Sequence, residues 1–292
     1  MPRSKKFWVA CLNITVHPHE DGVYERLMKA LAKVKSAPIY GDERGAINYL
    51  QPYSRGDISC LIGTFVRFTN LDPHTGWYDE ENKTNIDSPD KGRPIIPPNF
   101  KPNRRETIFV FFPGPRHHKL FYICNSFSPT KACKLLSGLA EDKVIKKNFG
   151  AVNVEMMTTR DAIEQILRLS LLSSLFIRVN LPNNDHLSDE EQAFVDYCLD
   201  GQNVRMIQQD MRPKSSTDSI KPNDQTKAMM RVATIHGNGY VVAKGRDRDT
   251  GGRREISSRD HPDKREMEID SQQTNVIVNS LVNLARKWLK IK

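Results

Sequence analysis

The sequence predicts an α+β protein made of two α/β layered halves, with mixed or antiparallel sheets and helices packed on one face. Strand-like apolar runs alternate with segments whose apolar residues recur at helical spacing. Hydrophobic residues make up 38% of the 292 residues, which is enough for a sizeable core. A proline-rich stretch separates two such regions. We therefore expect an N-terminal α/β region at 1–80, a linker or loop at 81–105 and a C-terminal α+β domain at 106–292.

The N-terminal region is predicted to hold a strand, a helix and a β-rich segment. The apolar run at 7–16 is typical of a strand. The helix that follows has its apolar face formed by Val23, Leu27, Ala30, Leu31 and Val34, and Pro38 is expected to end it. Residues 41–78 are predicted to be β-rich, with strands at 58–62 and 64–68 and a turn at 71–76. Five prolines within 81–105 indicate a segment without regular structure.

The C-terminal domain is predicted from turn and capping signals as well as from periodicity. Its expected elements are, in chain order, a hairpin of strands at 107–112 and 119–123, a helix capped by Ser128 with Pro129 in its first turn, a strand at 151–156, a helix capped by Thr159, a strand at 175–179, and a helix with a capping box formed by Ser188 and Glu191. This order of strands and helices is typical of a layered α+β fold.

A basic β-hairpin at 238–265 is the main candidate site. A strand begins near Tyr240, the chain turns at 250–252, and a second strand returns. Planar guanidinium groups spaced along such a hairpin suit a phosphate backbone. The candidate DNA-binding residues are Lys244, Arg246, Arg248, Arg253, Arg254, Arg259, Lys264 and Arg265. The alternative is a solvated hairpin whose charges are neutralised locally by Asp247, Asp249, Glu255 and Asp260.

The charge distribution favours a polyanionic partner. The chain has a formal net charge of +9. Residues 212–265 hold 13 basic and seven acidic residues and so carry +6 of that total. A local excess of this kind is the electrostatic footprint of a nucleic-acid-binding surface, and we expect double-stranded DNA to bind without sequence preference.

The C-terminal helix expected at 271–292 is amphipathic. Its apolar positions recur at heptad spacing, and the candidate dimer contacts are Ile277, Leu281, Leu284 and Trp288. A seam of this kind predicts a homodimer. A helix packed on its own domain accounts for the same spacing equally well.

The sequence assigns no catalytic residue, no metal ligand and no cofactor. The five cysteines are scattered without a Cys-x-x-Cys pair, and no phosphate-binding loop is found. No apolar run is long enough to cross a bilayer, and a secretion signal is not recognisable, so a cytoplasmic location is expected. Two alternative functions remain. One is a metal-dependent nuclease using Lys244, Asp247 and Asp249, and the other is an adaptor that recognises an acidic protein.

Three segments carry a family resemblance: KLFYICNSFSPTKACKLLSGL, VNVEMMTTRDAIEQILRLSLLSSLFIRVNLPN and NGYVVAKGRDRDTGGRREISSRDHP. Together they resemble an uncharacterised bacterial family of about this length, marked by Pro182-Asn183 after a strand and by a late strand at 238–241. The order of elements from 107 to 182 is also remotely similar to the RexA-like phage exclusion proteins. That resemblance implies a homodimer that binds DNA with little sequence preference and acts with a membrane effector encoded nearby. It implies no catalytic residues.

Overall fold

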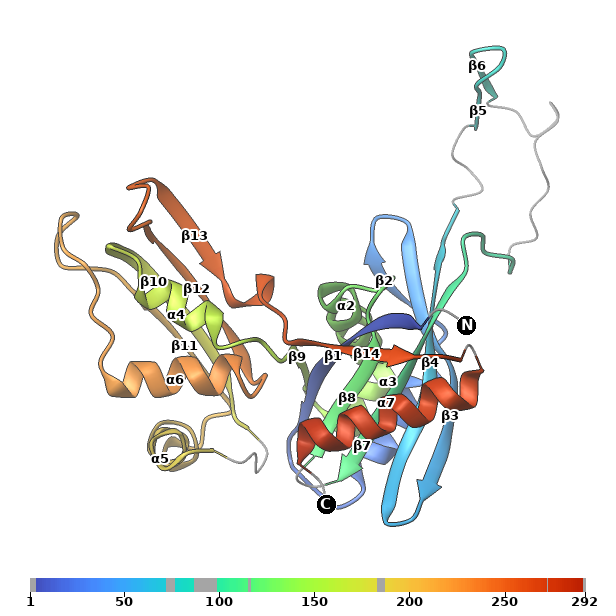
Figure 1. Cartoon of the computed structure of the whole chain (residues 1–292), viewed down its shortest axis with the longest axis horizontal. Coiled ribbons are helices and arrows are strands. Elements are labelled where there is room, and N and C mark those ends of the chain that lie inside the picture. Colours follow the sequence, from blue (N-terminus) through green and yellow to red (C-terminus); the bar gives the residue numbers. More distant parts are fainter. Residues whose placement is uncertain are drawn as a thin grey trace.

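The computed structural model describes residues 4–71, 77–86, 99–114, 117–182, 187–271 and 273–290. The chain forms an α+β fold, as the sequence predicts, with antiparallel sheets and helices. Two parts are visible, each built around its own sheet and joined by two short segments (Figure 1). We call them the larger part and the inserted part, because the second is inserted in sequence between two strands of the first.

The larger part contains an eight-stranded sheet. Along the hydrogen-bonded order its strands are β14 (Lys264–Ile269), β1 (Lys5–Val16), β8 (His117–Ile123), β7 (Arg105–Gly114), β4 (Ile58–Thr69), β3 (Glu43–Arg55) and β2 (Ala37–Tyr40). The eighth, β9 (Val152–Met156), pairs with the C-terminal half of β1. Strands from both sides of residues 81–105 therefore share this sheet, and the hydrophobic core does not divide at that segment.

Both faces of this sheet are covered. One face packs against α1 (Val23–Leu31), α2 (Pro129–Ala140) and α3 (Lys143–Phe149). The other packs against α7 (Thr274–Leu289), which lies across β7 and β8 (Figure 1). Side chains of a strand point alternately to the two faces, so β1 buries every residue from Val9 to Val16. This two-sided burial explains why apolar residues dominate the strand without alternating.

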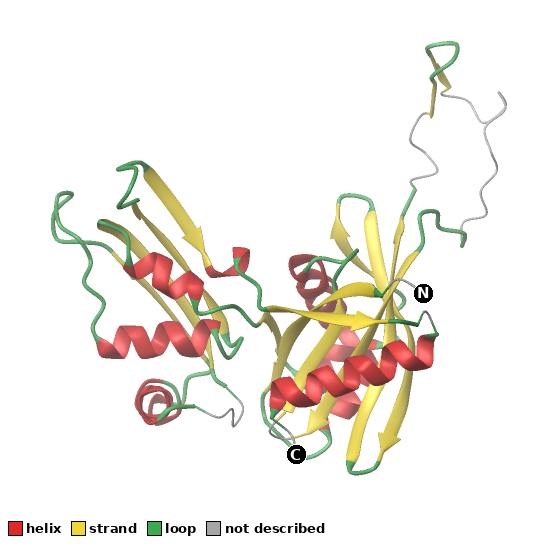
Figure 2. Cartoon of the chain, in the orientation of Figure 1, coloured by secondary structure: helices red, strands yellow, loops and turns green. Residues whose placement is uncertain are grey.

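The inserted part contains a four-stranded antiparallel sheet. Its strands in order are β11 (Met206–Met211), β10 (Leu171–Asn180), β12 (Gly239–Arg246) and β13 (Arg253–Ser257). Its helices are α4 (Asp161–Leu167), α5 (Asp189–Cys198) and α6 (Asp224–Thr234), with short 3-10 turns at Asp200–Gln202 and Ser258–Asp260. These helices bury one face of the sheet in a single core cluster (Figure 2).

Two chain segments connect the parts, and they hydrogen-bond to each other. The first runs from β9 to α4 and the second from β13 to β14. Asp263 N donates to Met157 O at 2.9 Å, and Thr159 N donates to His261 O at 3.0 Å. A buried contact adds to this connection, since Asn13 Nδ2 on β1 donates to Asn238 Oδ1 at 2.8 Å. The two parts therefore touch through a polar junction.

Several sequence predictions need correction. The strands expected at 58–62 and 64–68 form one strand, β4, which continues through Gly63. A Cβ at Gly63 would lie 2.4 Å from Tyr49 O, so this position requires a glycine. Pro38 lies in β2 and does not end the helix, which stops at Leu31. Thr159 does not cap α4, whose N-cap residue is Arg160.

Other predictions are confirmed. The capping box of Ser188 and Glu191 is present at the start of α5, and Ser128 caps α2 with Pro129 in the first turn. Within the segment predicted to lack regular structure, Thr84–Ile86 forms the strand β6, paired with β5 (Trp77–Asp79). Residues 87–98 of that segment, and the turn expected at 71–76 except Leu71, lie outside the described residues. None of the helices in the described ranges is long and apolar enough to cross a membrane.

Candidate nucleic-acid interface

The predicted hairpin is formed by β12 and β13, which pair Lys244 with Glu255 and Arg246 with Arg253. Its tip lies at the end of the inserted part that is farther from the joining segments (Figure 1). The hairpin is shorter than expected, because its second strand ends at Ser257. The strand β12 ends at Arg246, so Arg248 lies in the turn.

The turn is held by Asp247. Its Oδ1 accepts hydrogen bonds from the backbone N–H groups of Thr250 at 3.1 Å and Asp249 at 3.0 Å, and its Oδ2 accepts from Arg254 at 3.0 Å. These bonds favour the ionised carboxylate and lower the pKa of Asp247 below its ordinary value. An Asx turn closed in this way stabilises the backbone that joins the two strands of the hairpin.

Three arginines of the hairpin remain unpaired. Arg246, Arg248 and Arg253 are exposed, and within the described part of the chain their side chains make no ion pair or hydrogen bond. Local neutralisation is therefore incomplete. Two hairpin charges are neutralised by neighbours. Lys244 Nζ lies 3.0 Å from Glu255 Oε2, and Arg254 pairs with Asp247 and also donates to Gln165 Oε1 at 2.9 Å.

Arg259 belongs to the junction between the two parts. It follows β13 in the 3-10 turn, and its Nη2 donates to both carboxylate oxygens of Glu155 on β9, at 2.9 and 3.0 Å. Its guanidinium carbon also lies 3.7 Å from the ring centroid of Tyr240. Because a carboxylate and an aromatic ring already bind the Arg259 guanidinium, it is not available for phosphate, and we do not place Arg259 in the interface with the hairpin arginines.

Lys264 and Arg265 do not lie on the hairpin. Both are in β14 of the larger sheet, and Lys264 pairs with Ala10 of β1. Arg265 stacks on the Trp288 ring at 3.9 Å and lies 3.8 Å from Asp263, a carboxyl whose pKa burial raises and Arg265 partly lowers. The sequence missed β14 because its charged residues alternate with only two buried apolar ones, Met267 and Ile269.

The uncovered face of the inserted sheet extends the hairpin surface. On β12 the alternation places Tyr240, Val242, Lys244 and Arg246 opposite the helix-covered residues. On the neighbouring strand β10, the half-buried Phe176 lies on the same open face, with its ring centroid 5.8 Å from that of Tyr240. Sequence reasoning did not single out this face.

A shallow groove of about 530 Å³ lies at the hairpin end of this sheet. Lys244, Arg246 and Arg253 line it, together with Ser173 and Ser216. The groove therefore combines guanidinium and ammonium groups with hydroxyls, which are the side chains that contact phosphate oxygens in protein–DNA complexes.

The residues predicted to form a dimer seam pack on the larger sheet of the same chain. Leu281 and Trp288 are buried in a core cluster with Phe121 and other residues of that sheet, and Ile277 and Leu284 pack against the same cluster. A single chain therefore already covers the seam, and we assign no dimer interface to these four residues.

No three His, Cys, Asp or Glu side chains lie close enough to hold a metal ion, among the residues whose placement is described. Two of the residues considered for a nuclease, Lys244 and Asp247, are instead engaged in ion pairs with Glu255 and Arg254.

The fold and the site define an α+β protein with two large antiparallel sheets, one of which carries a basic hairpin and an open face. Residues 5–286 match the family described as Domain of unknown function (DUF4747), and the chain belongs to this family. The resemblance to an uncharacterised family is thereby confirmed. Searches of curated proteins and of solved structures give no match.

Proposed function

We propose that this protein binds double-stranded DNA without sequence preference, through the tip of the β12–β13 hairpin and the adjoining open face of the sheet. The observation that carries the proposal is that Arg246, Arg248 and Arg253, in and beside a turn closed by hydrogen bonds, are exposed and have no carboxylate partner in the described chain. Unpaired guanidinium groups break no existing ion pair when they bind phosphates, and the closed turn holds the backbone that carries them in place.

The shape of the site favours duplex over single-stranded DNA. A two-stranded β-ribbon fits the major groove, where its tip can reach the phosphates on either side. Single strands are usually bound by stacking bases on exposed aromatic rings. Here Arg259 already covers the Tyr240 ring, and Phe176 is partly buried. The open face therefore offers positive charge more readily than a stacking platform.

A biological role follows from the RexA-like resemblance. We propose that DNA binding in the cytoplasm serves phage exclusion or anti-phage defence, with a homodimer as the active form and a membrane effector encoded nearby. A dimer would double the number of phosphate contacts. Because α7 is packed on its own sheet, such a dimer would use a surface other than the predicted seam.

Fluorescence anisotropy with two short duplexes of unrelated sequence tests the proposal. We expect equal affinity for both duplexes and a steep loss of affinity from about 50 mM to about 200 mM KCl. Three phosphate contacts in each chain predict a log–log slope of about −3 for one chain. Absence of binding, or an affinity that ignores salt, would overturn the proposal. Incubation of plasmid with Mg²⁺ or Mn²⁺ separates it from the nuclease alternative, because nicking would favour that alternative.

A further inference from the structure

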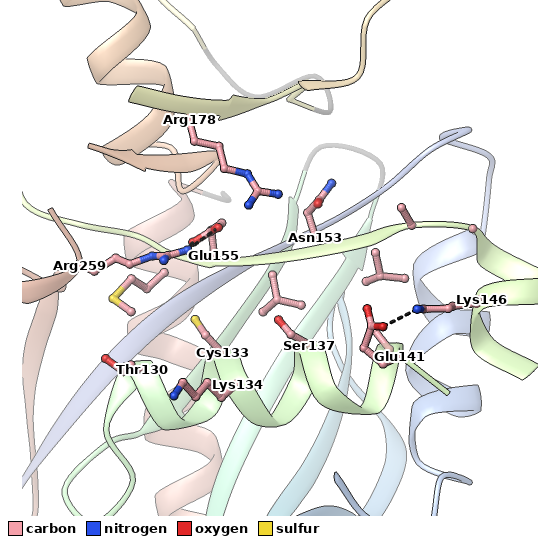
Figure 3. A pocket seen from close by; sticks show the side chains of 16 residues that line it. Thr130, Cys133, Lys134, Ser137, Glu141, Lys146, Asn153, Glu155, Arg178 and Arg259 are labelled. Carbon is pink, nitrogen blue, oxygen red and sulfur yellow. Dashed lines mark hydrogen bonds and ion pairs between the residues drawn. The ribbon is translucent and has the colours of Figure 1, made fainter. Parts of the chain in front are cut away.

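A second cavity, separate from the hairpin, lies between the two parts of the molecule. It has a volume of about 600 Å³ and is bounded by α2 and β9 of the larger part and by Arg178 of β10 (Figure 3). Cavities of this size are typical of sites for organic ligands. It shares no lining residue with the groove at the hairpin.

Two hydrogen-bond donors at this cleft lack partners. The Nε atom of Arg178 and the Nδ2 atom of Asn153 are buried and make no hydrogen bond within the described chain. Figure 3 shows the two side chains approaching each other, Arg178 from β10 and Asn153 from β9. Unsatisfied buried donors cost free energy, and both atoms can only donate. A ligand that satisfies them must bring acceptor oxygens.

The charges lining the cleft indicate an anion. Glu155 is bound by Arg259, and Glu141 is paired with Lys146. The remaining lining charges are both positive, those of Arg178 and Lys134. Lys134 Nζ lies 3.3 Å from the centroid of the Tyr40 ring, a contact that leaves its charge uncompensated by a carboxylate. An excess of two positive charges matches a phosphate monoester, which carries a charge of about −1.5 to −2 near neutral pH.

The opposite wall of the cleft is apolar. It consists of Ala140 of α2, Ala151 before β9 and the partly buried Val152 of β9, next to Ser137, and behind them Val154 and Met156 belong to the buried core. Ligand sites usually combine such a wall with a few polar groups that fix orientation. We propose that this cleft binds a small organic phosphate, with its phosphate on Arg178 and Asn153 and its organic body against the apolar wall.

Isothermal titration calorimetry with adenosine monophosphate and with inorganic phosphate tests this assignment on the full chain. We expect the nucleotide to bind more tightly than inorganic phosphate, because only the nucleotide has a body that fills the apolar side. Arg178→Met and Asn153→Asp should each weaken nucleotide binding by about tenfold or more. Arg168→Met is the matched control, since Arg168 lies on the surface outside the cleft and should leave affinity unchanged.

Three results would overturn the assignment. The first is that neither probe binds at millimolar concentration. The second is that both cleft variants keep wild-type affinity. The third is that a short oligonucleotide, but neither small probe, binds in an Arg178-dependent manner, which would assign the cleft to the nucleic-acid path. Loss of DNA binding in hairpin variants with nucleotide binding retained would separate this proposal from the proposed function. Asn153→Asp nearly conserves side-chain size, so it keeps the test valid if Arg178→Met fails to fold.

Discussion

The two large sheets of this molecule differ in how many of their faces are covered. The larger sheet packs against α1, α2 and α3 on one face and against α7 on the other. Among the residues that the structure describes, the inserted sheet packs against helices on one face only. Its other face carries the half-buried Phe176 and Tyr240 and leads to the exposed arginines of the hairpin.

The larger sheet is therefore buried on both faces, whereas the inserted sheet leaves one face open to a binding partner. In β1 every residue from Val9 to Val16 is buried, so substitution there acts on stability. In β12 burial alternates residue by residue, and the open side ends in Lys244 and Arg246. A sheet face that is left uncovered and enriched in basic residues fits a polyanion better than a protein core.

The largest expected effect is on stability, in the larger part. Leu281 is fully buried between α7 and the sheet, and Leu281→Ala should lower the free energy of unfolding by about 2–5 kcal/mol. Phe176→Ala on the open face should cost less, about 1–2 kcal/mol, because that side chain is only partly buried. Urea unfolding measures both. Equal losses of stability would contradict the difference in burial between the two sheets.

The same measurement examines the seam of α7. Packing within one chain predicts that the unfolding midpoint of wild type and of Leu281→Ala does not change with protein concentration. A midpoint that rises with concentration would show that α7 joins two chains, in agreement with the dimer predicted from heptad spacing.

A smaller effect is expected at Glu191, in the helical layer of the inserted part. Burial alone would raise the pKa of Glu191, but hydrogen bonds from Ser188 and the neighbouring His236 outweigh it, so the net pKa is lowered. A lowered folded-state pKa stabilises the protein above the unfolded pKa, near 4.3, and this contribution disappears as pH falls through the folded value. Glu191→Gln should therefore cost about 1–3 kcal/mol at neutral pH, and less below about pH 4.

Urea unfolding of wild type and Glu191→Gln across this pH range measures the difference. The wild-type advantage must shrink on acidification, because protonation removes the ionised carboxylate that Arg231 and His236 contact. An advantage that stays constant down to acidic pH would contradict the assigned shift.

The smallest effects distinguish two adjacent arginines of β13. Arg253 has no side-chain partner in the described chain, whereas Arg254 contacts Asp247 and Gln165. Arg253→Ala should weaken DNA binding by about fivefold, the equivalent of about 1 kcal/mol, without changing the melting temperature. Arg254→Ala should lower the melting temperature slightly, because solvent screens the surface pair with Asp247, and it should affect binding less. Weaker DNA binding in Arg254→Ala, together with lower stability in Arg253→Ala, would contradict these assignments.

Much of the fold could be predicted because its signals are local. The apolar run of β1, the capping box at Ser188 and the proline after Ser128 are each read within a few residues. The failures are non-local. Gly63 looks like a break in a strand, yet the close approach of Tyr49 and the Phe109 ring is what requires a glycine there. Only the paired strands reveal that requirement.

The candidate site could be predicted only in part, because some of its signals are local and others are not. Basic residues and a turn identify the hairpin, but which arginines are free depends on partners far away in sequence, such as Glu155 for Arg259. Arg178 was missed altogether. In the sequence, Arg178 is the single charged residue of the mostly apolar strand β10. Its role depends on a cleft wall formed by β9, which is distant in sequence.

The most direct measurement compares two triple variants with the same change of charge. Arg246→Ala, Arg248→Ala and Arg253→Ala together remove the unpaired hairpin arginines, while Lys29→Ala, Lys33→Ala and Lys35→Ala remove three exposed lysines at and just after α1. With melting temperatures unchanged, the hairpin variant should bind duplex DNA about a hundredfold more weakly and with a shallower salt slope. The lysine variant should bind like wild type. Equal affinities of the two variants would contradict a DNA-binding site on the hairpin.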